Sequence, residues 1–343
     1  HLKVDGSLLP FGDRALTGEE ILALAHSLMD EGQQRELAQT WECNLGVELK
    51  GTGRFRVNVF RQRGGPAMVI RYIKDRIPTF EELSLPTVLA ELISAKRGLL
   101  LVVGATGSGK STTLAAMIDY RNRNSRGHIL TIEDPIEFTH QHQKSIVNQR
   151  EVGIDTMSYE AALKNAMREA PDVILIGEVR DAATMKHALA YAETGHLCVS
   201  TLHANNANQT IDRILSFFSE NHRQQVRMDL ALNLLAVVSQ RLIPAKDGGR
   251  APAVEVMRQT RYISDLILKG EIESIKEAMR QSGIPGMQTF DESLYQLYQS
   301  GRISLEEALA NADSRNDLAL RIRLEGAAAQ SDSLGTAETP DLA

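Results

Sequence analysis

The chain has 343 residues, more than a single hydrophobic core usually organises, so two folded units are expected. A hydrophobic fraction of 43% and a charged fraction of 24% are typical of packed globular proteins and exclude a disordered or fibrous chain. The net charge of -6 offers no overall attraction to nucleic acid or to an anionic membrane, and two cysteines exclude a disulfide framework and a four-cysteine zinc site.

The pattern of apolar residues indicates a cytoplasmic protein. No apolar run approaches the roughly 20 residues that cross a bilayer, and the sequence does not open with a signal-peptide pattern. Cys43 and Cys198 are far apart and fit a reducing compartment. Because the sequence begins at His1 rather than methionine, we expect the first domain to be truncated at its start.

Residues 1–75 are predicted to form a small α+β domain. Strand-like stretches flank one helix over 19–39, which carries apolar residues at helical spacing after the capping candidate Thr17. The stretch 55–73 is typical of a β-hairpin, with two alternating runs divided at 62–66. Pro78 and Pro86 then mark a linker over 76–85.

A basic patch lies on this predicted hairpin, formed by Arg54, Arg56, Arg61, Arg63 and Arg71. Arg54 and Arg56 are two residues apart, so strand geometry places them on the same face. Such a face could bind nucleic acid, or could reach a nucleotide held by a neighbouring subunit in the manner of arginine fingers. Solvated surface arginines are an equally good interpretation for any single residue.

Residues 86–313 are predicted to form an α/β domain. From Gly98 onward, helical stretches separate four apolar runs, GLLLVVG, HILTIED, DVILIGE and HLCVSTLH. Such runs suit strands buried on both faces of a mostly parallel sheet covered by helices. We expect the sheet to end near residue 245 and helices to fill the remainder to 313. Residues 314–343 are small and polar, so we expect them to be disordered.

A phosphate-binding loop is the strongest motif in the chain. It lies between the strand-like run LLLVV and the helix-like run STTLAAMIDY, as a P-loop requires. Its backbone N–H groups converge on the β- and γ-phosphates, Lys110 neutralises their charge, and the Ser111 hydroxyl ligates Mg²⁺. The motif and the residue after it are Gly104, Ala105, Thr106, Gly107, Ser108, Gly109, Lys110, Ser111 and Thr112. ATP and Mg²⁺ are the expected cofactors.

A second acidic element is needed to organise the magnesium ion and the attacking water. The run DVILIGEVRD supplies it, because its apolar residues 173–176 are expected in a central strand that ends at Gly177 and Glu178. Ligands of open α/β sheets bind at the carboxyl ends of the strands. We therefore interpret Glu178 as the Walker-B carboxylate, acting on Mg²⁺ through water. An ordinary strand-end carboxylate is the alternative.

Two further groups of polar residues flank the expected strands. Glu133, Asp134 and Glu137 follow one apolar run, and Glu133 or Glu137 could act as a general base, although such a cluster is more often a solvated turn. His196 and His203 bracket the run LCVSTL, and we expect both near the same edge, where an imidazole could sense the γ-phosphate. A structural hydrogen-bonding role is the simpler interpretation of the histidines.

Together these segments resemble the secretion-type ATPases of type IV pili, and most of all the retraction ATPases of the PilT/PilU family. The resemblance covers nearly the whole chain and is carried by GATGSGKSTTLAAMIDY, HILTIEDPIEF, NQREVG, PDVILIGEVRD and AETGHLCVSTLHANNANQTIDRI. It implies a hexameric ring in which each subunit has a PAS-like N-terminal domain and a RecA-like ATPase domain, with ATP at the junction between subunits. By position it makes Glu137 the Asp-box glutamate, Glu178 the Walker-B glutamate, and His196 and His203 the His-box residues. The arginines of the first domain would complete the site of an adjoining subunit.

The resemblance also implies a function, which is the coupling of ATP hydrolysis to pilus retraction and twitching motility. The implied partners are a PilT-type ATPase and an inner-membrane platform protein, with membrane contact made only through partners at the cytoplasmic face. Two departures stand out. Ala170 replaces an acidic residue, and Ser264 and Asp265 replace the arginine-asparagine pair of a segment tied to retraction. The first has little consequence because Asp172 remains, whereas the second, together with the polar segment after residue 313, favours the PilU branch and a motor that depends on PilT.

Three other functions compete with this one. A pilus extension or type II secretion ATPase usually carries a four-cysteine metal site, which Cys43 and Cys198 cannot form. A nucleotide-gated subunit that binds a partner and hydrolyses little ATP stays compatible with the motifs. A nucleic-acid translocase is disfavoured by the acidic charge balance, and no nucleic acid is expected as a partner.

Overall fold

The computed structural model describes residues 1–4, 7–73 and 76–334, and the chain divides into two compact units. The first unit consists of His1–Arg76 together with Glu137–Thr139. The second begins at Ile77, runs to Ile136 and resumes at His140. Within the described residues, no helix combines the length and the apolar character that crossing a membrane requires.

The first unit has two helices and an antiparallel sheet, in the order β3-β4-β5. Alternate strand residues face the helices, so Cys43, Leu45, Val57 and Val59 form a core with Ala25 of the first helix. A separate pair of antiparallel strands, β1 and β2, precedes this sheet in the chain. The elements are β1 (Leu2–Val4), β2 (Ser7–Leu9), α1 (Gly18–Leu28), α2 (Glu31–Thr40), β3 (Glu42–Leu49), β4 (Gly53–Gln62) and β5 (Gly65–Ile73).

Thr17 caps α1 as predicted, in a capping box with Glu20. The prediction of one continuous helix over 19–39 is wrong, because the chain is extended at Met29 and Asp30. The Asp30 side chain accepts a hydrogen bond from the Gln33 backbone N–H at 2.8 Å, which starts a second helix. Aspartate competes in this way with helix continuation, since its short side chain satisfies free N–H groups.

The predicted β-hairpin is confirmed as β4 and β5. Its turn residues Arg63 and Gly64 both have positive φ angles, 48° and 80°. Paired positive φ values match the right-handed twist of the strands that the turn connects. Cross-strand pairing places Arg56 opposite Arg71.

The second unit contains a seven-stranded sheet in the order β12-β11-β6-β10-β9-β7-β8. All neighbouring pairs are parallel except β11 and β12. The four apolar runs predicted as strands are β6, β7, β9 and β10. The seven strands are β6 (Gly98–Val103), β7 (Gly127–Glu133), β8 (Ser145–Glu151), β9 (Val173–Ile176), β10 (Leu197–Leu202), β11 (Leu234–Pro244) and β12 (Arg250–Arg258).

The sheet extends further than the sequence predicted. We expected it to end near residue 245, but β12 continues it to Arg258 by pairing antiparallel with β11. β12 is buried along almost its whole length, at an edge that the C-terminal helices cover. Burial under these helices stabilises β12 as a strand, although we expected this segment to be helical.

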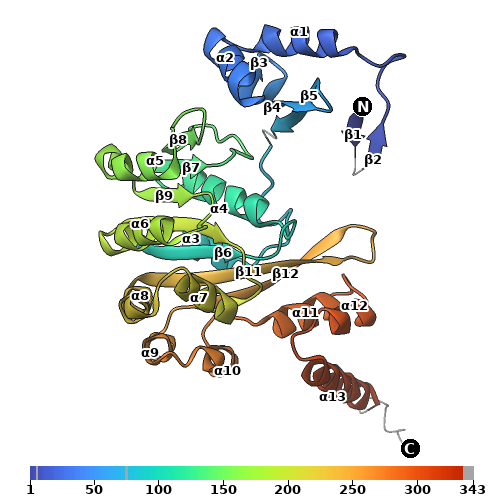
Figure 1. Ribbon diagram of the computed structural model, residues 1–343. Helices are drawn as coiled ribbons and strands as arrows, with labels where there is room; N and C mark the ends of the chain where they lie inside the picture. The colour runs from blue at the N-terminus through green and yellow to red at the C-terminus, as the bar shows by residue number, and fades with distance from the viewer. Residues whose placement is uncertain (5–6, 74–75, 335–343) are drawn as a thin grey trace, which may run out of the picture. The chain divides into compact units, whose positions relative to one another are not determined.

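Helices cover both faces of the sheet (Figure 1). On one face, α3 and α4 pack on side chains such as Leu100 and Val102, and on the other face α5 to α10 pack on neighbours such as Leu99 and Leu101. These helices are α3 (Val88–Ile93), α4 (Lys110–Asn124), α5 (Tyr159–Ala166), α6 (Ala182–Glu193), α7 (Ala207–Ser216), α8 (Glu220–Asn233), α9 (Arg261–Lys269) and α10 (Ile275–Gln281). Ile263, Leu266 and Ile267 form the buried face of α9.

The C-terminal helices, orange to red in Figure 1, form a small core against the β11–β12 hairpin. They are α11 (Phe290–Gln299), α12 (Leu305–Ala310) and α13 (Arg315–Leu334). The predicted disorder of 314–343 is wrong for 315–334, which is helical, and 335–343 lies outside the described residues. Apolar packing holds this helix in place, since Leu318 is only 2% exposed and packs with Phe290 and Leu294.

We predict that Leu318→Ala lowers the free energy of unfolding by about 2–4 kcal/mol, because it removes a buried side chain and leaves a cavity. Leu320→Ala is the matched control, since Leu320 is in the same helix but 57% exposed, and it should change stability by less than about 0.5 kcal/mol. Chemical unfolding of both variants measures the difference. Equal stability of the two variants would contradict the packing of α13.

Candidate active site

The candidate site lies at the carboxyl edge of the parallel strands. In the sheet, β10 lies between β6 and β9, and β7 follows β9. The residues that follow these strands therefore emerge side by side: the P-loop after β6, His203 after β10, Glu178 shortly after β9, and Asp134 after β7. Segments up to about 100 residues apart in the sequence meet there because parallel strands point the same way.

The P-loop connects β6 to α4, as its motif required. Gly109 caps α4 with a φ angle of 92°, and Ser111 and Thr112 lie in the first turn of the helix. The Lys110 ammonium donates hydrogen bonds to the carbonyl oxygens of Gly104 at 2.8 Å and Ala105 at 3.0 Å. The loop is thus curled around its own lysine, with the N-terminus of α4 beside it, which is an arrangement suited to anions.

Gln240 supports the loop from behind, and sequence reasoning missed it. Its side-chain oxygen accepts a hydrogen bond from Thr113 of α4 at 2.7 Å. A Cβ atom at Gly104 would lie 2.5 Å from the Gln240 carbonyl oxygen, and one at Gly109 would lie 2.7 Å from its side-chain nitrogen. The glycines are therefore required by the close approach of β11. No local motif marks Gln240, because it is an ordinary position of a buried strand.

Glu178 lies between an imidazole and a guanidinium. Its Oε1 is 2.9 Å from His203 Nε2, and its Oε2 accepts a hydrogen bond from Arg180 Nε at 2.6 Å. Arg180 also lies 3.7 Å from Asp134. The contact with Glu178 raises the pKa of Arg180 above its ordinary value. Sequence analysis did not assign Arg180, although its place two residues after Glu178 was a usable signal.

Glu133 and Asp134 lie at the end of β7 beside Glu178. Glu133 accepts hydrogen bonds from Thr131 at 2.7 Å and from Gln149 at 3.2 Å. The neighbouring Tyr159 hydroxyl has a raised pKa, first because of burial and then because of Asp134. The tyrosine hydroxyl therefore keeps its proton, and it can act as a hydrogen-bond donor or acceptor.

His196 and His203 lie at opposite ends of β10, so the expectation that both histidines share one edge is wrong. His196 precedes β10, and its carbonyl oxygen accepts from the N–H of Gly98 at the start of β6. His203 follows β10, whose residues rise about 3.3 Å each, so the six-residue strand separates the backbones of the two residues by roughly 20 Å. His196 instead bonds to Thr194 at 3.1 Å, which fits the structural role.

Glu137 and the basic patch belong to the first unit. Glu137 therefore lies in a different compact unit from Glu133 and Glu178, and its role stays a prediction. Arg54, Arg56 and Arg71 share one face of the β4–β5 hairpin, as the register shows. Arg61 points to the other face, where its guanidinium lies 5.7 Å from the centre of the Trp41 ring. Arg63 lies in the turn.

A pocket of about 550 Å³ opens beside the P-loop, and its other walls come from β11, the start of β12, α7 with the turn before it, and the segment after α12. This volume is in the range of small-molecule sites. Residues on these walls include Asn205, Gln209, Arg250, Asn311 and Asp313. A second pocket of about 530 Å³ shares Gly104 and Ala105 and is lined by His203.

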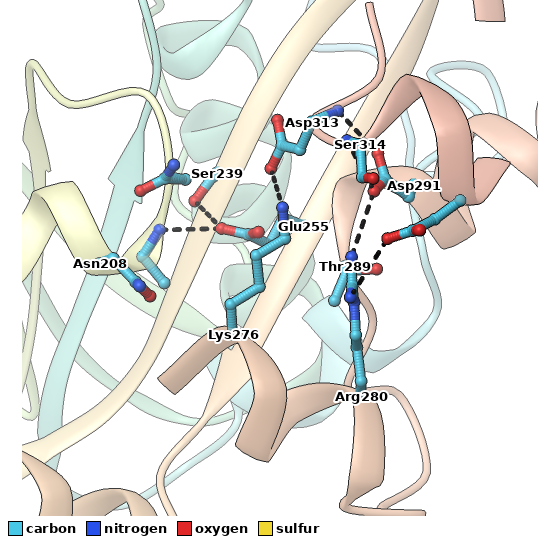
Figure 2. A network of polar contacts seen from close by, with 12 residues as sticks. Asn208, Ser239, Glu255, Lys276, Arg280, Thr289, Asp291, Asp313 and Ser314 are labelled. Atoms are coloured by element: carbon cyan, nitrogen blue, oxygen red, sulfur yellow. Dashed lines mark hydrogen bonds and ion pairs between the residues drawn. The ribbon is translucent and has the colours of Figure 1, made fainter. Parts of the chain in front are cut away.

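Glu255 is a buried carboxyl group close to this pocket, and sequence analysis did not identify it. It is 2% exposed and lies on β12 opposite Ser239 of β11. Burial raises the pKa of Glu255 to about 7, hydrogen bonds from Ala207 and Ser239 oppose the rise, and Asp313 adds to it. Figure 2 shows this carboxyl group within a network of polar contacts.

We predict that Gly104→Ala abolishes nucleotide binding, because the new methyl group would collide with Ser108 Oγ and the Gln240 carbonyl oxygen. Gly153→Ala is the matched control: it has a φ of +85° but open space around it, so it tests strain alone. Fluorescent ADP titration measures both. Wild-type affinity in Gly104→Ala would contradict the described loop geometry.

We predict that Glu255→Gln gains stability relative to the wild type as the pH rises from 5 to 8. A carboxyl group whose pKa is raised in the folded state stabilises the fold below its ordinary pKa of 4.5, and that contribution is lost as the pH rises towards about 7. The relative gain is on the order of 2–3 kcal/mol. Thermal melting of both proteins at pH 5 and pH 8 measures this gain, and Glu193→Gln, at an exposed position, is the control. If the stability of wild type and of Glu255→Gln changed with pH in parallel, the effect of burial would be contradicted.

Comparison with known proteins places this geometry in a family. The family model described as "Type II/IV secretion system protein" matches residues 29–319. The type IV pilus ATPase PilU of Pseudomonas aeruginosa is 54% identical over 336 residues, covering 98% of this chain and 88% of PilU. PilT of the same organism, named a type IV pilus retraction ATPase, is 43% identical and covers 91% of this chain and 90% of PilT.

Two solved structures share the fold. The pilus retraction motor PilT with bound ADP has a TM-score of 0.85 and 43% identity, covering 92% of this chain and 90% of PilT. The Legionella pneumophila ATPase DotB has a TM-score of 0.77 and 28% identity, with coverages of 89% and 86%. The predicted order of an N-terminal α+β domain and a RecA-like ATPase domain is thereby confirmed. This chain belongs to the type II/IV secretion system protein family, and it is a nucleotide-binding ATPase.

Proposed function

We propose that this chain couples ATP hydrolysis to the retraction of type IV pili, as a motor that works together with a PilT-type ATPase. The observation that carries the proposal is the similarity to PilU along nearly the whole chain. The departure at Ser264 and Asp265, in the α9 segment, favours the PilU branch over PilT itself. The motor would depend on its partner ring for full retraction.

The nucleotide would lie with its phosphates in the P-loop. Lys110 would exchange its bonds to the Gly104 and Ala105 carbonyl oxygens for phosphate oxygens, which carry full negative charge and bind an ammonium more strongly. The N–H groups of the loop and of the α4 N-terminus would bind the same phosphates. The neighbouring pocket has room for the remainder of the nucleotide.

Ser111 and Glu178 would hold Mg²⁺, with phosphate oxygens and water completing its shell. Their oxygen atoms are of the kind that this ion prefers, and Mg²⁺ usually takes only one or two protein ligands beside phosphates. Among the described residues, no group of three or more His, Cys, Asp or Glu side chains gathers to hold a metal alone, which suits such a shared site. When bound, the ion would neutralise charge on the phosphate oxygens.

Hydrolysis needs a base and a cation near the attacking water. Glu178 and Glu133 lie at neighbouring strand ends, and we propose that Glu178 orients the water while Glu137, by family position, or Glu133 accepts its proton. His203, 2.9 Å from Glu178, would hold that carboxylate in place. Arg54, Arg56 and Arg71, which share one face, would supply positive charge to the site of an adjoining subunit.

The proposed assembly is a homo-hexameric ring at the cytoplasmic face of the inner membrane. Such a ring places arginines of one subunit beside the nucleotide of the next. An inner-membrane platform protein and a PilT-type ATPase are the proposed partners, so that contact with the membrane is made through them. A pilus extension or secretion ATPase is the second candidate, and the presence of only Cys43 and Cys198 weighs against the four-cysteine form of it.

We predict that Lys110→Ala abolishes ATP binding, while Glu178→Gln retains binding and lowers kcat by about 100-fold or more. The reason is that Lys110 contacts phosphate directly, whereas Glu178 acts on water and metal. Lys164→Ala, an exposed lysine on α5, is the charge-matched control and should behave as wild type. ADP titration and steady-state hydrolysis separate the two effects; wild-type turnover in Glu178→Gln would remove Glu178 from the mechanism.

We predict that the purified chain hydrolyses ATP faster in the presence of a PilT-type partner than alone. Its activity alone and in the mixture, together with its mass in solution, measures this dependence. The Lys110→Ala variant in the mixture controls for turnover by the partner. Full activity of the isolated chain, unchanged by the partner, would make it an autonomous motor and contradict the accessory role.

A further inference from the structure

Glu255 is a carboxyl group that the P-loop chemistry does not use, although it is almost completely buried. Removing a carboxylate from water is unfavourable unless hydrogen bonds or an opposite charge compensate. In the part of the chain that the structure describes, Glu255 has no ion-pair partner, because the nearby Lys276 ammonium is bonded to Asp313 at 2.8 Å. Its compensation is therefore a pair of hydrogen bonds.

One oxygen atom of Glu255 accepts both of these hydrogen bonds. The Ala207 backbone N–H donates to Oε1 at 2.8 Å, and the Ser239 hydroxyl donates to the same atom at 3.0 Å. Ala207 is the first residue of α7, and Ser239 lies on β11. A single acceptor thus connects the start of a helix to a strand (Figure 2).

Each end of this connection reaches the nucleotide pocket. On one side, Ser239 precedes Gln240, which supports the P-loop through Thr113. On the other side, Ala207 follows the turn 203–206, in which Asn205 and Asn206 line the pocket and His203 contacts Glu178. Glu255 therefore connects β11, which lies behind the P-loop, with the turn 203–206, whose His203 contacts Glu178.

The charged groups that face Glu255 come from the C-terminal part of the second unit. Lys276 of α10 and Asp313 after α12 are the nearest, and Asp313 is also bonded to Arg241 of β11 at 2.7 Å. The two cations share the one Asp313 carboxylate, which leaves the cluster with one net positive charge, and neither cation forms an ion pair with Glu255 among the described residues. Glu255 is left to act through its two hydrogen bonds rather than through an ion pair.

We propose that Glu255 is a positioning residue for ATP hydrolysis, which sets the 203–206 turn against the P-loop so that His203 holds Glu178 in its working orientation. The proposal rests on the proposed function and adds a residue to it that touches neither nucleotide nor metal. Loss of the bridge would leave the P-loop and its phosphate contacts in place. It would affect turnover more than nucleotide binding.

Glu255→Ala is the principal test, because it removes the shared acceptor. We expect kcat to fall about 10- to 100-fold, the size of effect that a misplaced catalytic group produces, while ADP affinity changes less than about threefold. Glu255→Gln keeps an acceptor oxygen at the same place and should restore kcat to within about threefold of wild type. Ser239→Ala removes one arm only and should give an intermediate kcat.

Ser293→Ala is the matched control. The Ser293 hydroxyl is buried and accepts from the N–H of Val254, one residue from Glu255, but Ser293 belongs to α11 and has no part in the bridge between α7 and β11. This variant loses a buried hydrogen bond to the same strand without touching the bridge, so its kcat should match wild type. An equal loss of kcat in Ser293→Ala and Glu255→Ala would overturn the proposal in favour of general destabilisation.

Hydrogen exchange of the amides over 204–210 tests the bridge independently of ATP hydrolysis. In nucleotide-free protein we expect faster exchange there in Glu255→Ala, and wild-type exchange in Glu255→Gln and Ser293→Ala. Unchanged exchange and kcat in a folded Glu255→Ala protein would overturn the proposal. If wild-type protein does not hydrolyse ATP, the proposed function fails, while the exchange data still decide whether Glu255 holds the turn.

Discussion

The parallel pairing of β6 with its neighbours β10 and β11 is the constraint on which the site depends. Residues 99–103 of β6 are completely buried, so this strand can only lie in the centre of the sheet. Parallel register then brings the ends of β11, β6, β10 and β9 out at one edge. The order in space at this edge is β11, the P-loop, His203 and Glu178, although these segments are not consecutive along the chain.

Close contact at this edge leaves little freedom for side chains. Gly104 and Gly109 exist because β11 approaches the P-loop through Gln240, and a Cβ atom at either position would overlap it. Glu178 is likewise confined by His203 and Arg180. A site built in this way is preorganised, since each functional group is held by a neighbour before any nucleotide arrives.

The C-terminal part of the second unit contributes more than packing. Its cluster of Asp313, Lys276 and Arg241 lies where β11 passes from the P-loop towards α11 and α12, and Asp291 binds the backbone N–H groups of Asp313 and Ser314. Arg241 also stacks over the Phe290 ring at 3.8 Å. The hairpin β11–β12 therefore joins the pocket beside the P-loop, Glu255 and the C-terminal core in one continuous structure.

The sequence by itself determined the P-loop, the four central strands, the α1 cap and the β4–β5 hairpin, because each is encoded in adjacent residues. A glycine-rich loop between an apolar strand and a helix, or a threonine three residues before a glutamate, is recognisable without knowing what surrounds it. Expectations that used only local pattern or composition, such as one helix over 19–39 and a disordered segment from 314, were overturned.

Only the tertiary structure decided which distant residues meet. It separated His196 from His203 by the length of β10, selected Gln240 and Arg180 as partners of the predicted motifs, and buried Glu255 between α7 and β11. It also made β12 and α13 ordered elements by covering them with apolar neighbours such as Phe290. The physical reason is that burial and hydrogen bonding across a sheet depend on contacts made by the folded chain, which no local sequence pattern records.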